Sequence, residues 1–292
     1  MDKFHEPVLV AEVIAWMNLK DDGIYCDCTV GGGGHLLKML EYTRNARFVG
    51  IDWDPEAIAY VQKCLGDFRE RVDLYEENYI YLDELAARMN IKGFNGILFD
   101  LGASWHQLTT PERGFSFNLE GKLLMQMSPA VFPLYEKLHR TNPVELYGIL
   151  KEYGDVPNAR KLAKFIYQRR NELKTTIDLR RLIERHSPQK LLKKNLHKVF
   201  QALRIWTNEE LKNLRVGLEK AINLLQPQGR LIVIAYHSGE DRIVKEIFKK
   251  FEKNKTLKLL HKKVIRPNAE EVRRNPAARS ARMRVGEKCA SC

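Results

Sequence analysis

Tyr25-Cys-Asp-Cys-Thr-Val-Gly-Gly-Gly-Gly-His35 is the stretch of sequence that decides the fold. Residues 24–30 alternate in polarity and predict a short buried strand, and the apolar spacing after His35 predicts a helix. The glycines between them carry no Cβ, so a ligand could approach the backbone and meet free N–H groups at the helix N-terminus. This pattern is typical of a cofactor cradle. The alternative is an ordinary glycine-rich turn that binds nothing.

A second apolar run, residues 47–52, ends in Asp52, 21 positions beyond Gly31. An acid at this spacing holds the ribose hydroxyls of a nucleotide in Rossmann-type folds. A strict G-x-G-x-x-G motif begun at Gly31 would end where this chain has Leu36, so the pyrophosphate-binding fingerprint fails. A cofactor with an adenosine ribose and no phosphate remains, which is S-adenosyl-L-methionine.

Strand and helix patterns alternate through the first hundred residues and favour a parallel, doubly wound α/β sheet. We expect strands at 24–30, 47–52, 72–77 and 96–101, with helices at 35–43, 55–65 and 81–89 between them. Ligands of such sheets bind beyond the carboxyl ends of the strands. Asp27, Asp52 and Asp100 are expected at those ends.

The strand signals stop between about Thr109 and Lys198, where helical patterns with basic faces replace them. We therefore expect an α/β core over 1–108 and 199–265, interrupted by a helical domain over 109–198. This domain is either a plain helical cap over the site or a substrate-recognition lid that grips a polyanion. The basic segment 266–292 is expected to be a tail, either disordered or ordered by contact with the site or with RNA.

The distribution of positive charge along the chain indicates what kind of ligand the protein binds. The net charge of +12 is concentrated in 160–185, 190–198 and 245–288, which is the pattern of a protein that holds phosphates. A highly charged surface of the kind found in heat-adapted proteins is the alternative.

No apolar run is long enough to span a bilayer and the first residues lack a signal peptide's features, so we expect a soluble, cytoplasmic protein. Cys289 and Cys292 form a C-x-x-C without a second ligand pair, and no cluster has convincing metal spacing, so we predict no metal site.

Several stretches taken together resemble the bacterial RsmH (MraW) methyltransferases nearly end to end. The matching segments are His5-Glu-Pro-Val-Leu9, Asp27-Cys-Thr-Val-Gly-Gly-Gly-Gly-His35, Gly50-Ile-Asp-Trp-Asp-Pro55, Gly96-Ile-Leu-Phe-Asp-Leu-Gly102, Arg113-Gly-Phe-Ser-Phe117, Phe200-Gln-Ala-Leu-Arg-Ile-Trp206, His237-Ser-Gly-Glu-Asp-Arg242 and Asn275-Pro-Ala-Ala-Arg-Ser280. The resemblance implies a Rossmann-like class I methyltransferase sheet with an inserted helical domain. It also implies methylation of N4 of a decoding-centre cytidine in 16S rRNA, within the small ribosomal subunit, with S-adenosyl-L-methionine as cofactor.

The resemblance implies that the family's cofactor contacts fall, by motif, on seven residues of the first part of the core. They are Gly33, Gly34 and His35 in the cradle, Asp52 on the ribose, Tyr79 beside the adenine, and Asp100 and Gln107 near the methionine end. Nothing in the sequence decides between a monomer and a homodimer.

For the chemistry, a cytosine N4 amine needs an acceptor for its N–H, and Asp100 is the candidate catalytic residue, with Ser104 as a second contact. The target base must be unstacked, and aromatic side chains in the loops would receive it. Trp105, Phe115 and Phe117 are the candidates, with core packing as the alternative for each. His237 could touch the substrate or serve as a structural hydrogen-bonding group.

Two segments depart from the family pattern. The family's usual Val-Ser-Ser-Pro-Gln-Leu-Asp reads Ala103-Ser-Trp-His-Gln-Leu-Thr109, and its Leu-Asp-Met-Arg-Met-Asp reads Leu123-Leu-Met-Gln-Met-Ser128. These changes keep two alternatives open. One is a divergent RNA-binding paralogue with an altered target or lost activity. The other is a methyltransferase for a non-RNA substrate.

Overall fold

The computed structural model describes residues 7–290, which form two compact units. The first unit comprises the described residues up to Gly102 together with those from Leu211 onward, and the second unit is Ala103–Glu210. The expected interruption at 109–198 lies inside the second unit.

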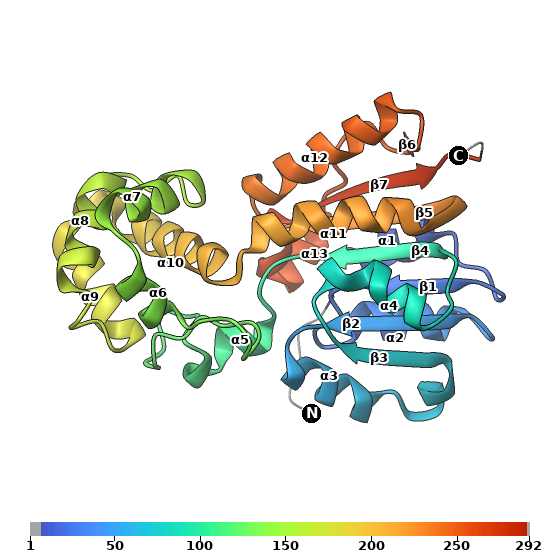
Figure 1. Cartoon of the computed structure of the whole chain (residues 1–292), viewed down its shortest axis with the longest axis horizontal. Coiled ribbons are helices and arrows are strands. Elements are labelled where there is room, and N and C mark those ends of the chain that lie inside the picture. The colour runs from blue at the N-terminus through green and yellow to red at the C-terminus, as the bar shows by residue number, and fades with distance from the viewer. Residues whose placement is uncertain (1–6, 291–292) are drawn as a thin grey trace. The chain divides into compact units, whose positions relative to one another are not determined.

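The first unit is built on a seven-stranded, mostly parallel sheet in the order β3-β2-β1-β4-β5-β7-β6 (Figure 1). Its strands are β1 (Ile24–Asp27), β2 (Arg47–Asp52), β3 (Val72–Glu76), β4 (Phe94–Asp100), β5 (Leu225–Ala235), β6 (Leu257–Leu259) and β7 (Arg282–Lys288). Strands β1 to β5 are parallel, and β7 runs antiparallel to both β5 and β6. The expected α/β class with a Rossmann-like methyltransferase sheet is confirmed.

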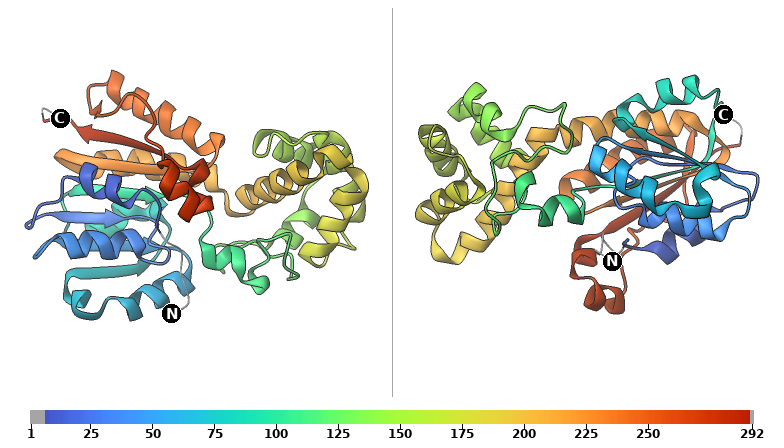
Figure 2. Two further views of the ribbon diagram at one scale, coloured as in Figure 1. Left: turned by 180° about the vertical axis from the view of Figure 1, so that it is seen from behind. Right: turned by 90° about the horizontal axis from the view of Figure 1, so that it is seen from below.

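Helices cover both faces of this sheet, as the two further views show (Figure 2). The helices of the first unit are α1 (Val10–Met17), α2 (Gly34–Tyr42), α3 (Pro55–Cys64), α4 (Leu82–Arg88), α11 (Glu210–Leu224), α12 (Ser238–Lys253) and α13 (Ala269–Arg274). The buried side chains of α1, α2 and α3 form one core layer, and those of α4, α11 and α12 form the other. Alternation along the strands supplies both layers: Ile97 and Phe99 face one, and Leu98 faces the other.

The C-terminal segment is not a tail, so that expectation was wrong. Its strand β7 lies inside the sheet and pairs with β5 from Arg230↔Glu287 to Ala235↔Arg282. Met283 and Val285 are fully buried in the core layer of α1, α2 and α3. On the opposite face of β7, Arg284 Nε donates to Asp241 Oδ1 of α12 at 2.7 Å. The charge of Arg284 thus has a partner on α12, and the neighbouring apolar residues Met283 and Val285 are buried in the core.

The second unit is helical and has a hydrophobic core of its own. Its helices are α5 (Trp105–Thr109), α6 (Leu134–Arg140), α7 (Pro143–Glu152), α8 (Ala159–Arg169), α9 (Thr176–His186) and α10 (Leu192–Asn208). The apolar stripe of α8 buries Leu162, Ala163 and Ile166, as its spacing predicts. Within residues 7–290, no helix combines the length and apolar character needed to cross a membrane.

Candidate active site

The three acids expected at strand ends lie at the carboxyl ends of three neighbouring strands. Asp27 ends β1, Asp52 ends β2 and Asp100 ends β4. Strand β1 lies between β2 and β4, and the helix that follows β1 packs on the face opposite α4 and α11. This is the switch point where open α/β sheets bind their ligands.

Asp52 organises the cradle through its two carboxylate oxygens. Its Oδ2 accepts a hydrogen bond from the Gly31 N–H at 2.8 Å, and its Oδ1 accepts one from the Asp54 N–H at 3.0 Å. The loop is also tied to β2 by the Val30 N–H, which donates to the Ile51 carbonyl. The acid that the sequence assigned to a ribose is therefore also the residue that fixes the glycine loop.

The cradle glycines serve two different purposes. Gly31 has a φ of +50°, and the nearest atom to a Cβ built there is 3.9 Å away, so its surroundings are open. A Cβ on Gly33 would lie 3.0 Å from Val61 Cγ2, and one on Gly34 would lie 2.8 Å from Pro7 Cγ. Gly33 and Gly34 thus allow α2 to pack closely on its own unit, and the space that could admit a ligand is beside Gly31.

His35, in the first turn of α2, is buried beside Asp100. Its Nε2 lies 3.4 Å from Asp100 Oδ2, and the side chain is 5% exposed. Burial opposes the charged form, but Asp100 and Asp27 outweigh it and raise the pKa of His35 above its usual value. Among the described residues, no atom accepts or donates a hydrogen bond at Nδ1 of this ring. A buried ring nitrogen without a partner is suited to a ligand contact.

Asp100 is held by two further contacts that the sequence did not predict. The Tyr236 hydroxyl donates to Asp100 Oδ1 at 2.9 Å, and the Asp100 N–H donates to Thr29 Oγ1 at 2.6 Å. Tyr236 directly follows β5, so the rule that drew attention to Asp27 and Asp52 could also have found it.

Asp27 is the most deeply buried acid of the cluster, at 1% exposure. Burial raises the pKa of its carboxyl to about 7, against the opposing effects of His35 and of the Thr29 N–H that it accepts. A carboxyl with this pKa changes charge near neutral pH, which is typical of functional sites.

Tyr79, expected beside an adenine, begins a short 3-10 turn after β3. Its ring meets Phe99 of β4 edge to face, with centroids 5.3 Å apart. A Cβ on Gly217 of α11 would lie 2.5 Å from Tyr79 Cδ2, so α11 needs a glycine at that position. The ring is thus fixed by packing inside the first unit.

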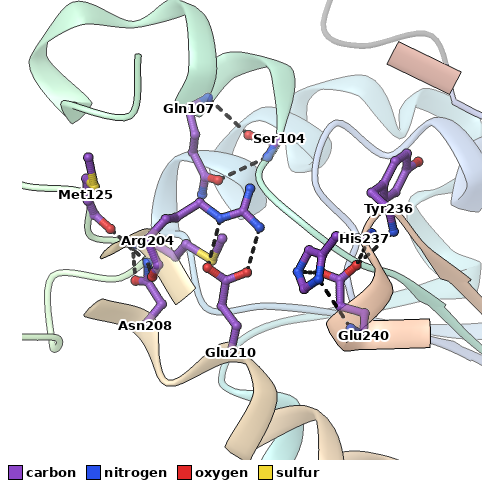
Figure 3. A network of polar contacts seen from close by, with 10 residues as sticks. Ser104, Gln107, Met125, Arg204, Asn208, Glu210, Tyr236, His237 and Glu240 are labelled. Carbon is purple, nitrogen blue, oxygen red and sulfur yellow. Dashed lines mark hydrogen bonds and ion pairs between the residues drawn. The ribbon is translucent and has the colours of Figure 1, made fainter. Parts of the chain in front are cut away.

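Ser104 and Gln107 belong to the second unit, where they cap α5 (Figure 3). The Gln107 N–H donates to Ser104 Oγ at 3.2 Å, and Gln107 Oε1 accepts from the Ser104 N–H at 3.0 Å. This capping box has a recognisable spacing, Ser-x-x-Gln, that the sequence reasoning overlooked. Each side chain has at least one structural role, whatever it contacts in a complex.

The candidate substrate aromatics differ in exposure. Trp105 is 46% exposed, whereas Phe115 is 5% exposed. Phe117 packs edge to face on His197 and Phe200 of α10, at centroid distances of 4.9 and 5.4 Å. The structure favours packing roles for both phenylalanines, and Trp105 is the most exposed of the three candidate rings.

His237 is the N-cap of α12 and forms a capping box with Glu240 (Figure 3). Its Nδ1 accepts a hydrogen bond from the Glu240 N–H at 3.3 Å, and the Glu240 carboxylate accepts from the N–H groups of Tyr236 and His237. This geometry favours the structural alternative for His237. It also fixes the backbone that carries Tyr236.

The divergent segment 123–128 is held through its backbone. Asn208 donates to the Met125 carbonyl and accepts from the Met127 N–H, each at 2.8 Å (Figure 3). The Arg113 guanidinium donates to the carbonyls of Gln126 and Met127. Because these contacts reach main-chain atoms, the changed side chains at positions 124, 126 and 128 do not remove what holds this loop.

The second unit also carries a basic surface, which we define as Lys161 and Lys164 of α8, Arg185 of α9, Lys190, and Lys193 and Lys194 of α10, all exposed. Asn195 Nδ2 donates to Ser187 Oγ at 2.8 Å and brings the start of α10 to the end of α9. His186 stacks on Phe165 with a centroid distance of 3.5 Å. Burial and the charges of Lys161, Arg185 and Arg169 lower the pKa of His186. No described carboxylate forms an ion pair with the six cations of the basic surface.

The described residues contain no group of three or more His, Cys, Asp or Glu side chains that could hold a metal ion. Cys289 is partly buried and its N–H donates to the Thr256 carbonyl beside β6. Cys292, the other member of the C-x-x-C, lies outside the described residues.

A search against protein families matches residues 2–289 to the MraW methylase family. The chain belongs to the MraW methylase family. Curated relatives named "Ribosomal RNA small subunit methyltransferase H" are 40% identical in Sulfurihydrogenibium sp. and 41% identical in Thermotoga neapolitana. Each alignment covers 97% of this chain, and 99% and 96% of the respective relative. The protein is a methylase of this family, and its cofactor is S-adenosyl-L-methionine.

Proposed function

We propose that this member of the MraW methylase family methylates small-subunit ribosomal RNA, and that its target is N4 of a cytidine in the decoding centre of 16S rRNA. The names of the curated relatives support the coarser statement, and the motifs of the sequence support the finer one. The observation that carries the proposal is the set of acids and open glycine backbone at the carboxyl ends of β1, β2 and β4.

The cradle fits the cofactor. Gly34 and His35 supply N–H groups at the start of α2, which has no side-chain cap, while the Gly33 N–H donates to the Val30 carbonyl and Gly33 contributes only its lack of a Cβ. Asp52 supplies a carboxylate for the ribose. The unpartnered Nδ1 of His35 and the space beside Gly31 are the features that a ligand would fill. The assignments of Tyr79 to the adenine, and of Asp100 and Gln107 to the methionine end, rest on the family motif.

Methyl transfer from this cofactor requires few acid or base groups. When bound, S-adenosyl-L-methionine supplies a methyl group already activated by its sulfonium. An N4 amine that received this methyl group would have one proton to lose, so the chain must provide a group that takes it. Asp100, 16% exposed, accepts the N–H of the amine and takes that proton. The Ser104 hydroxyl is the second proposed contact, and Trp105 stacks on the unstacked base.

The basic surface of the second unit is proposed to hold the RNA backbone. Its six exposed cations lack carboxylate partners among the described residues, so their charge is available to phosphates. A methyltransferase for a small molecule would gain nothing from this arrangement. The surface therefore favours RNA over a non-RNA substrate.

The first experiment is transfer of labelled methyl from S-adenosyl-L-methionine to 30S subunits that lack the modification, followed by mapping of the labelled nucleoside. N4-methylated cytidine in the decoding region is the expected product. Label at another nucleoside would overturn the finer assignment. No transfer, with the cofactor still bound by calorimetry, would favour the RNA-binding paralogue that has lost its chemistry.

Asp100→Ala tests the assigned acceptor in the same assay. We expect turnover to fall by about 100-fold or more, because the amine loses the group that takes its proton. Cofactor binding measured by calorimetry separates this loss from a collapsed site. Near-normal turnover would show that Asp100 is not the acceptor.

A further inference from the structure

The carboxylate of Asp100 is held between side chains from two other elements of the first unit. Its Oδ1 accepts a hydrogen bond from the Tyr236 hydroxyl at 2.9 Å, and its Oδ2 lies 3.4 Å from His35 Nε2. Tyr236 follows β5 and His35 lies in the first turn of α2, so the carboxylate at the end of β4 is fixed from both sides. A carboxylate has about four lone-pair positions, and these contacts leave others free for a substrate N–H.

Tyr236 is itself held in place. Its N–H donates to Glu240 Oε2 at 2.8 Å within the N-terminal cap of α12. Its ring lies beside Gly102, where a built Cβ would be 3.6 Å from Tyr236 Cδ2. The tyrosine therefore packs on the segment that follows Asp100 as well as bonding to its carboxylate.

The hydroxyl keeps its proton at physiological pH and can donate it in a hydrogen bond. Burial raises the pKa of Tyr236 well above its usual value, and the negative charges of Asp100, Glu240 and Glu271 act in the same direction. Glu271 of α13 is itself fixed, since its Oε1 accepts the Leu9 N–H at 2.7 Å. The neutral phenol thus directs its proton to Asp100.

We propose that Tyr236 is a positioning residue for the methyl transfer, and that its hydroxyl holds Asp100 in the orientation that accepts the N–H of the incoming amine. His35 supports the same carboxylate from its other oxygen. This inference rests on the proposed function, because Asp100 has a proton to accept only if an amine is methylated. Neither Tyr236 nor its hydroxyl need contact the substrate.

Tyr236→Phe removes the hydroxyl and keeps the ring. We expect kcat to fall about 10- to 100-fold, since a misoriented acceptor is costly. The KM for the RNA and the Kd for S-adenosyl-L-methionine should stay within about twofold, because neither ligand is held by this hydroxyl. A structural defect would instead weaken cofactor binding or lower the amount of folded enzyme.

Tyr25→Phe is the matched control. Tyr25 is fully buried in the same unit, and its hydroxyl accepts the Lys20 N–H at 2.6 Å, at the end of β1 opposite the acids. Its loss costs a buried hydrogen bond without touching Asp100, so kcat should be unchanged. A 3-fluorotyrosine at position 236 retains the hydroxyl and should restore turnover.

Two measurements distinguish the proposed RNA target from the proposed role of Tyr236. The position of the label in the RNA tests the proposed target, and the ratio of total methyl transfer between wild type and Tyr236→Phe tests the positioning role. Equal kcat for wild type and Tyr236→Phe would overturn the inference while leaving the target intact. Equal losses in Tyr236→Phe and Tyr25→Phe would overturn it too, and no transfer by the wild type would overturn both proposals.

Discussion

Gly31 and Gly34 stand three positions apart, and a methyl group added at each should have a different effect. In Gly34→Ala the new Cβ would lie 2.8 Å from Pro7 Cγ, so we expect a loss of about 1–3 kcal/mol in the free energy of unfolding. In Gly31→Ala the space is open and only the positive φ is unfavourable, at about 1 kcal/mol. Its new methyl would, however, narrow the space proposed for the cofactor.

Urea unfolding measures the change in stability of each variant, and calorimetric titration with S-adenosyl-L-methionine measures the change in cofactor affinity. We expect Gly31→Ala to lose more affinity than stability, and Gly34→Ala to lose more stability. Wild-type affinity in Gly31→Ala would show that the cofactor does not use the space beside this glycine.

Asp27 and His35 make the stability of the protein depend on pH. Burial raises the pKa of Asp27 to about 7, and contacts with Asp100 and Asp27 raise that of His35 against the effect of burial. In both cases the folded state binds the proton more tightly than the unfolded chain, so stability falls as pH rises, from about 4 to about 7 through Asp27 and above about 6.5 through His35. Urea unfolding across this range should show the decline, and Asp27→Asn should flatten it. An unchanged slope in Asp27→Asn would place the origin elsewhere.

Sequence reasoning found individual site residues only where a local rule applied. Asp52 and Asp100 follow apolar runs, so the strand-end rule located them. The Tyr236 contact joins residues 136 positions apart and depends on how β4 and β5 pair, which no local pattern specifies. The capping roles of Ser104 and His237 compete with the functional roles that a motif alone suggests.

Among the elements, β7 offers the clearest test of the fold. Met283→Ala should lower the free energy of unfolding by about 2–5 kcal/mol, since this side chain is fully buried in the core. Lys258→Ala, on the exposed face of neighbouring β6, should change it by less than about 0.5 kcal/mol. Thermal and urea unfolding of both variants provide the comparison. A neutral Met283→Ala would be inconsistent with an internal β7.

Most of the alternating elements could be predicted, because apolar periods of two and of 3.6 differ clearly in the first hundred residues. The strand β7 could not be recognised by charge, since Arg282 and Arg284 interrupt its apolar residues. Asp241 of α12 pairs with both guanidinium groups, and only the folded structure shows this shared partner. The alternation of Met283 and Val285 with charged residues was the available signal.

For the whole molecule, the excess of positive charge predicts salt-dependent binding of RNA. Replacing Lys161, Lys164 and Arg185 together by glutamine should weaken binding and reduce the slope of log K against log salt by about one for each phosphate that is no longer neutralised. Lys245, Lys249 and Lys253 on α12 are also exposed, and their replacement removes the same charge from the first unit.

Filter binding of small-subunit RNA between low and physiological salt gives both slopes. We expect the triple variant of the basic surface to lose slope and the α12 variant to retain it. Equal reductions in the two variants would show that net charge, and not the basic surface, determines binding.

The position of β7 also constrains the order in which the protein can be made. A ribosome synthesises the cradle, the acids of β1, β2 and β4, and the whole second unit before it reaches residues 282–288. Domains fold as units during synthesis, so the helical unit has all its residues while the sheet still lacks an inner strand. Newly made chains therefore acquire a complete sheet only after residues 282–288 have been synthesised, and a ribosome that stalls before this segment holds a chain with every site residue but an unfinished sheet.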